Sequence, residues 1–155
     1  AVALLDARGF GAEDFARSHP GGALGRKLLT HVRDVMQPAE RVATVAATDA
    51  IPAVLQAISR GGMGMAAVLD VSGTLVGIFT DGDLRRALEK LGDLRPIAVG
   101  DIMSRNPRTI GPERLAVAAV EMMERHKVNQ LLVTDAAGRL VGALNMHDLF
   151  RAKVV

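Results

Sequence analysis

Hydrophobic and polar residues alternate along this chain with a period that changes from segment to segment. Short apolar runs predict strands, and residues 70–73, which begin with Asp70 and end with Gly73, predict a turn between two of them. Apolar residues spaced three or four apart predict a helix with Thr48 as its N-cap and the pair Gly61 and Gly62 at its end. A second helix is expected from Thr80 to Lys90. The extended segments are predicted at 42–45, 65–69 and 75–79, and the first helix has apolar positions at Ile51, Val54, Leu55 and Ile58.

The second half of the chain shows the same order of elements. A helix is predicted to start near Pro112, because proline is tolerated in the first turn of a helix. The strands are predicted at 108–110, 131–134 and 140–145, and the last helix at 147–153. The helix after Pro112 has apolar positions at Leu115, Val117, Ala118, Val120, Met122 and Met123.

Two matching stretches show that the second half repeats the first. VRDVM at 32–36 matches VGDIM at 99–103, and residues 75–84 match 140–149, with Asp83 aligned to Asp148. Each copy reads strand, helix, strand, strand, helix, and a unit of about 55 residues buries too little surface to be stable alone. We therefore predict an α+β fold, in which two β-α-β-β-α repeats pack as a pseudo-twofold pair with clefts between them.

Composition excludes several classes of function. The chain has 19 Lys plus Arg against 17 Asp plus Glu, a net charge of +2, which gives no electrostatic case for binding nucleic acid or a membrane surface. It lacks Trp and Tyr, so base-stacking surfaces are not expected. It also lacks cysteine, which excludes disulfides and suits a reducing compartment such as the cytoplasm. The histidines show no metal-site spacing, and we expect no metal.

One motif present in both copies could carry chemistry. It reads GIFTDGD in the first copy and GALNMHD in the second. Thr80 with Asp83, and Asn145 with Asp148, have the spacing of a helix capping box, and a carboxylate there also complements the helix dipole. A carboxylate in this position can also accept hydrogen bonds from both hydroxyls of a ribose. Spacing alone favours the capping role, and the ligand role would use the same geometry.

The repeat and its Gly-x-x-Thr-x-x-Asp ending resemble a tandem pair of CBS domains. These are regulatory modules that commonly bind adenosyl and other nucleotides between their two copies. The resemblance implies that Thr80 and Asp83 contact one ligand, and that Asn145 and Asp148 contact another, although Asn145 stands where the family has Ser or Thr. Further candidate ligand-binding residues are Arg86, whose fork fits a phosphate or carboxylate, and His147, which lies inside the second motif.

Residues 18–29 narrow the resemblance further. With the motifs at 34–36 and 79–86, they are similar to the D-arabinose 5-phosphate isomerase family, in which a sugar isomerase (SIS) domain precedes a CBS pair. The resemblance implies a SIS tail at 1–30, CBS repeats at 31–92 and 97–155, and a catalytic role for His19 in the parent enzyme. The first residue is Ala and residues 1–7 read as a helix already under way. We expect a fragment of a longer enzyme, itself inactive.

The predicted function is regulation of that aldose–ketose isomerase, which supplies the lipopolysaccharide sugar Kdo. The expected regulatory ligand is the activated end product CMP-Kdo or an adenine nucleotide, AMP or ATP, bound in the inter-repeat cleft, and no cofactor is expected. The alternative is a structural module without a ligand, in which Thr80 and Asp83 only cap a helix. Either role is expected in a homodimer, because packing two copies leaves apolar helix faces exposed.

Overall fold

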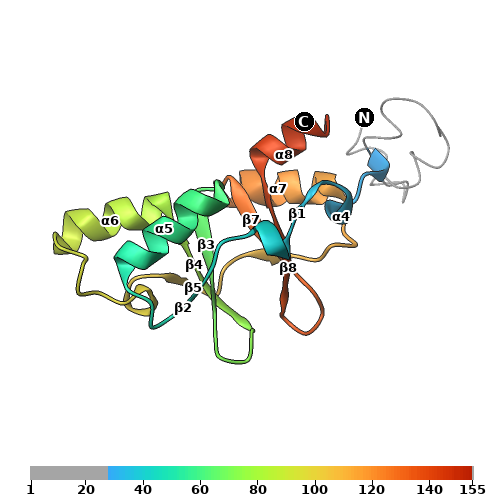
Figure 1. Ribbon diagram of the computed structural model, residues 1–155. Coiled ribbons are helices and arrows are strands. Elements are labelled where there is room, and N and C mark those ends of the chain that lie inside the picture. Colours follow the sequence, from blue (N-terminus) through green and yellow to red (C-terminus); the bar gives the residue numbers. More distant parts are fainter. Residues whose placement is uncertain (1–27, 155) are drawn as a thin grey trace. The chain divides into compact units, whose positions relative to one another are not determined.

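The computed structural model describes residues 28–154, shown in Figure 1. They belong to two compact units that do not coincide with the sequence repeats. One unit contains Gln37–Ile110 and Leu132–Ala143, and the other contains 28–36, 111–131 and 144–154. The helix expected at 1–7 and the catalytic candidate His19 lie outside the described residues.

The described helices and strands follow the predicted order in both repeats. The helices are α4 (Val32–Val35), α5 (Ile51–Gly61), α6 (Asp81–Leu91), α7 (Ala116–His126) and α8 (Met146–Arg151), with 3-10 turns at Ala39–Arg41 and Val99–Asp101. The strands are β1 (Gln37–Pro38), β2 (Thr44–Ala46), β3 (Met65–Leu69), β4 (Leu75–Thr80), β5 (Ser104–Arg105), β6 (Thr109–Ile110), β7 (Gln130–Thr134) and β8 (Leu140–Asn145). The predicted α+β class and the two repeats are confirmed.

The strands form two four-stranded sheets with equivalent orders. One sheet runs β2-β3-β4-β5 and the other β6-β7-β8-β1. In both sheets the first pair is parallel, β2 with β3 and β6 with β7, as expected for strands joined through a helix. The last pair of each sheet, β4 with β5 and β8 with β1, is antiparallel.

The two repeats exchange their leading segments, which the sequence did not reveal. Strand β5 belongs to the start of the second repeat, yet Ser104 pairs with Ile78 of β4 in the first. Strand β1 belongs to the start of the first repeat, and Gln37 pairs with Ala143 of β8 in the second. Both strands have only two residues, so they carry no alternating pattern that would predict them. Each sheet is therefore completed by the other repeat.

The exchange also explains why two predicted helix starts are wrong. Helix α5 has Ala50, not Thr48, as its N-cap, and no side chain caps it. The Ile51 N–H donates instead to the carbonyl of Ile97, at 3.2 Å, in the connection between the repeats. Helix α7 begins at Ala116 rather than near Pro112, and the Ala116 N–H donates to the Thr30 carbonyl at 2.8 Å. Backbone carbonyls from a distant segment thus satisfy N–H groups that local side chains were expected to satisfy.

Apolar side chains pack on both faces of the first sheet. Figure 1 shows α5 and α6 on one side of β3 and β4, and the core on this side contains the buried side chains of Val54, Val68 and Phe79. On the opposite face, a cluster contains Val42, Met65 and Ala67 from the first repeat and Leu132 and Ala143 from the second. Sheet residues of the two repeats therefore share one core, as the predicted pairing requires.

Helix α7 shows which of its predicted apolar positions lie inside. Its buried residues are Ala116, Ala119 and Met123, whereas Val117, Ala118, Val120 and Met122 are half-buried. The helix starts later than predicted, and its small alanines form the inner face. Burial along α7 thus follows a narrower stripe than its many apolar residues suggested.

The turn between β3 and β4 is organised by Asp70. Its Oδ1 accepts hydrogen bonds from the backbone of Ser72 and Thr74, both at 2.9 Å, and from the Ser72 hydroxyl at 2.7 Å. These donors, the Ser72 hydroxyl above all, lower the pKa of the Asp70 carboxyl. In the second repeat Asp135 accepts from the backbone of Ala137 and Arg139 in the same way. The predicted turns are confirmed.

We expect Gly77→Ala to destabilise the protein by about 1–3 kcal/mol, as overpacking does in a tight contact. A Cβ at Gly77 would overlap the Met103 sulfur and lie 3.0 Å from the Ser104 carbonyl oxygen, so strand β5 would have to move. Urea unfolding followed by far-ultraviolet circular dichroism measures the effect. Val71→Ala at an exposed turn is the control, with a change below about 0.5 kcal/mol. Equal stability of both variants would contradict the exchanged pairing.

Candidate ligand-binding site

The carboxylate of Asp83 joins three segments at the end of β4. Its Oδ2 accepts from the Thr80 backbone N–H at 3.0 Å and from the Thr80 hydroxyl at 3.1 Å. Its Oδ1 accepts from Arg86 at 2.6 Å and from the Ser104 hydroxyl at 3.0 Å. The Asp83 N–H donates to Thr80 Oγ1 at 3.2 Å, which completes a capping box. The predicted capping role of Thr80 and Asp83 is confirmed.

The second motif has the same construction at the start of α8. The Asp148 N–H donates to Asn145 Oδ1 at 2.8 Å, and Asp148 Oδ2 accepts from the Asn145 N–H at 3.0 Å. Arg151 donates to Asp148 Oδ1 at 2.7 Å. Asn145 therefore caps its helix as Thr80 does, although its amide differs from the hydroxyl of the first copy. Both carboxylates are buried, Asp83 with 8% and Asp148 with 4% of its surface exposed.

Each motif also lies against the start of the preceding strand. The Asp81 N–H donates to the carbonyl of Gly64 at 3.1 Å, and the Met146 N–H donates to the carbonyl of Asn129 at 2.9 Å. Gly64 has a positive φ of 68°, and a Cβ there would lie 3.0 Å from Asp81 Oδ2. Glycine thus permits the close approach of the strand entry to the helix start. These backbone contacts fix where each carboxylate lies.

The structure brings some of the predicted residues together and leaves others apart. Thr80, Asp83 and Arg86 form one connected group, whereas Asn145 and Asp148 form a second. His147 is exposed in the first turn of α8, next to Asp148 in the chain. The placement of a ligand between the two repeats stays a prediction, as does each residue's contact with a ligand.

A family model describing the CBS domain matches this chain twice, at residues 32–90 and 99–155. The chain belongs to the CBS domain family. The exchanged sheets and the paired motifs are therefore features of a CBS pair, and the family predicted from the Gly-x-x-Thr-x-x-Asp ending is confirmed.

Two curated relatives and one solved structure show what this chain is similar to. The chain is 52% identical to arabinose 5-phosphate isomerase KdsD of Pseudomonas aeruginosa and 44% identical to KdsD of Escherichia coli strain K12, with all 155 residues aligned. It spans about half the length of these curated relatives, 48% and 47%. The crystal structure of CBSX2 in complex with AMP has a TM-score of 0.71 and 26% identity, and the match covers 81% of this chain and 96% of CBSX2. The predicted resemblance to the isomerase family is thus confirmed.

Two polar residues of the CBS motifs were missed from the sequence. Arg151 occupies the position of Arg86 in the repeat, so the alignment of Asp83 with Asp148 would have found it. Ser104 carried no signal, because it reaches Asp83 only through the exchange of strand β5. The sequence repeat could have indicated Arg151, whereas only the pairing of β5 with β4 brings Ser104 to Asp83.

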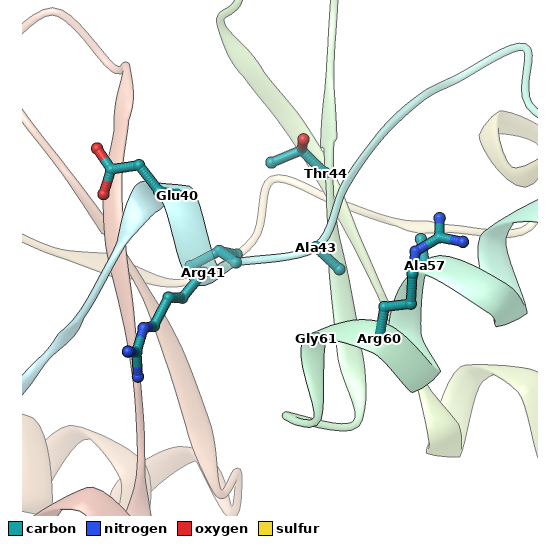
Figure 2. A pocket seen from close by; sticks show the side chains of 8 residues that line it. Glu40, Arg41, Ala43, Thr44, Ala57, Arg60 and Gly61 are labelled. Carbon is teal, nitrogen blue, oxygen red and sulfur yellow. The ribbon is translucent and has the colours of Figure 1, made fainter.

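A surface pocket of about 530 Å³ lies elsewhere in the first CBS repeat. Its walls come from the entry to β2 and the last turn of α5, and none of the predicted ligand residues lines it. Figure 2 shows the side chains of Arg41 and Arg60 extending in different directions, so they do not form one anion site. The pocket is lined by Glu40, Arg41, Val42, Ala43, Thr44, Ala57, Arg60 and Gly61.

A membrane-spanning helix and a cluster of side chains for a metal ion are both absent from the described residues of this CBS pair. No helix within 28–154 combines the length and apolar character that crossing a bilayer requires. In the same part of the chain, no three His, Asp or Glu side chains lie close enough to hold a metal ion.

We expect Thr80→Ala to lower the free energy of unfolding by about 1 kcal/mol, the usual cost of losing an N-cap. The variant leaves the Asp83 N–H without its side-chain acceptor. Thr80→Ser keeps the hydroxyl and should restore most of that stability, measured by thermal or urea unfolding. A Thr80→Ala variant as stable as the wild type would contradict the capping box.

Proposed function

We propose that this CBS pair is the regulatory nucleotide-binding module of an arabinose 5-phosphate isomerase. The supporting observation is that the chain builds the same buried carboxylate, on the same strand-to-helix turn, in both repeats. Identity with KdsD relatives supports the parent enzyme, and the AMP complex of CBSX2 supports a nucleotide as ligand. The cytoplasm is the compartment that suits both a nucleotide ligand and a chain without cysteine.

The role that we assign to each side chain follows from its chemistry. Asp83 and Asp148 are acceptors for the two hydroxyls of a ribose, and Thr80 and Asn145 hold them in place. Arg86 lies in the second turn of α6 and His147 in the first turn of α8, and both are exposed, as a group that meets a phosphate or a sugar carboxylate must be. The ligand is AMP, ATP or CMP-Kdo. The ligand shifts the equilibrium between the active and inactive arrangements of the enzyme by the difference between its binding free energies for the two.

Titration calorimetry of this chain with AMP, ATP, CMP and CMP-Kdo tests the proposal. We expect binding of at least one compound, weakened about tenfold or more by Asp83→Asn or Asp148→Asn, since each variant replaces an ionic acceptor by a neutral amide. Asp81→Asn is the matched control, because Asp81 is exposed two positions before Asp83. No heat from any of the four compounds would refute the nucleotide role.

The alternative is a ligand-free module for oligomer assembly. It is favoured by the complete hydrogen bonding of Asp83 within the protein, and by Leu88, Leu91 and Phe150, whose side chains are largely exposed. Exposed apolar helix residues also support our proposal of a homodimer. A folded Asp83→Ala protein that is less stable but has unchanged affinity for every compound would favour the alternative.

A further proposal concerns the isomerase reaction itself. His19 is the family's catalytic histidine by resemblance, and a histidine suits proton transfer because its pKa lies near neutral pH. We place residues 1–30 as the tail of the SIS domain, whose phosphate-binding loop and other catalytic groups precede them in the parent enzyme. The CBS repeats then occupy 31–92 and 97–155.

We expect no turnover of arabinose 5-phosphate by the purified 155-residue chain, because His19 would lack its catalytic partners. Formation of ribulose 5-phosphate can be followed by proton NMR, with a complete KdsD enzyme as the positive control. Measurable turnover above the uncatalysed rate would refute this assignment of the catalytic parts.

A further inference from the structure

The Asp83 carboxylate has no acceptor site left for a ligand. An ionised carboxylate offers about four lone-pair sites, two on each oxygen. Thr80 supplies two donors to Oδ2, and Arg86 and Ser104 supply one each to Oδ1. A ribose that is to donate both of its hydroxyls to Asp83 must therefore replace two of these donors.

The four donors differ in how readily they can leave. Both Thr80 donors belong to the helix cap, and their loss would expose orphaned groups at the start of α6. The backbone of Ser104 is held by the pairing of β5 with β4, but its hydroxyl proton can rotate away from Oδ1 and leave that site to one ribose hydroxyl. The second hydroxyl then needs the site that Arg86 occupies. The Arg86 side chain is 66% exposed, and only its own flexible methylene chain connects the guanidinium to α6. Water can therefore solvate the guanidinium once it leaves Asp83. Arg86 is the donor that a ligand can displace.

The local sequence makes room for this arginine over the carboxylate. A Cβ at Gly82 would lie 3.3 Å from Arg86 Nη1 and 3.6 Å from Thr80 Oγ1, so the absent side chain leaves space for the guanidinium. The second repeat keeps the contact at the same spacing. There the Arg151 side chain, 62% exposed, donates to the corresponding oxygen of Asp148, whose side chain alone is 2% exposed. In both repeats, therefore, an exposed arginine forms an ion pair with the buried carboxylate.

We propose that Arg86 is an internal competitor that occupies the Asp83 oxygen in the free protein and must leave it when a ribose diol binds. This inference rests on the proposed nucleotide function and deepens it, because it makes the ion pair part of the binding equilibrium. The ion pair between Arg86 and Asp83 then raises the ligand concentration that is needed to fill the site. The displaced guanidinium is free to meet the anionic group of the same ligand.

A neutral nucleoside separates this competition from any attraction between Arg86 and a phosphate. Adenosine and cytidine, each with its 2′-deoxy counterpart, are titrated into the wild-type chain and into Arg86→Ala, with binding followed by NMR to reach weak affinities. We expect Arg86→Ala to bind the matching ribonucleoside about three- to fivefold more tightly, the size of one exposed ion pair. The 2′-deoxynucleoside should show no gain, because it lacks one hydroxyl of the diol.

Arg85→Ala is the matched control. Arg85 is the exposed neighbour of Arg86 on α6 and makes no ion pair with the described residues. We expect its affinities to equal those of the wild type. Circular dichroism of each variant shows that the helix is intact, and a merely structural loss at Arg86 would not tighten binding of a ribonucleoside alone.

The outcomes separate the inference from the function on which it rests. Unchanged or weaker ribonucleoside binding by Arg86→Ala, in a chain that binds the matching nucleotide, overturns the competition and leaves the nucleotide function standing. An equal gain for the deoxynucleoside also overturns it, because Asp83 would then not be meeting the diol. No binding of any nucleotide or nucleoside by the wild type or by any variant overturns the proposed function itself.

Discussion

The exchange of leading segments between the repeats is the constraint on which the rest of the structure depends. The segment that opens the second repeat gives β5 to the first sheet, its Ile97 carbonyl to the start of α5 and its Ser104 hydroxyl to Asp83. The segment that opens the first repeat gives β1 to the second sheet, and the Thr30 carbonyl caps α7. Each repeat thus lacks an edge strand and a helix cap until the other supplies them. The first N–H groups of α5 and α7 are therefore satisfied only in the pair.

Capping and ligand binding are compatible uses of the same carboxylate. The capping box orients Asp83 through Oδ2, whereas Oδ1 faces the two donors that come from farther away, Arg86 and Ser104. A carboxylate fixed at one oxygen and exchangeable at the other is preorganised for a diol, since its position does not have to be established when the ligand arrives. The hydrogen bonds that stabilise the start of α6 therefore also position the carboxylate that a ligand would use.

The sequence predicted those parts of the fold whose causes are local or repeated. The strand at 65–69 was located to the residue, and Thr80 caps its helix as expected, because apolar runs and capping boxes act over a few positions. The N-cap expected at Thr48 and the helix start expected near Pro112 were wrong, since carbonyls far along the chain accept from the first N–H groups of α5 and α7. The contact of Ser104 with Asp83 spans 21 residues and depends on a two-residue strand, so no local pattern could indicate it.

The exchange has a further consequence for how such a chain can be divided. A single repeat expressed alone would expose the open edge of its last long strand, β4 or β8, and such an edge invites pairing with another chain. Cutting the chain at the connection 92–98 and separating the halves would therefore open both sheets.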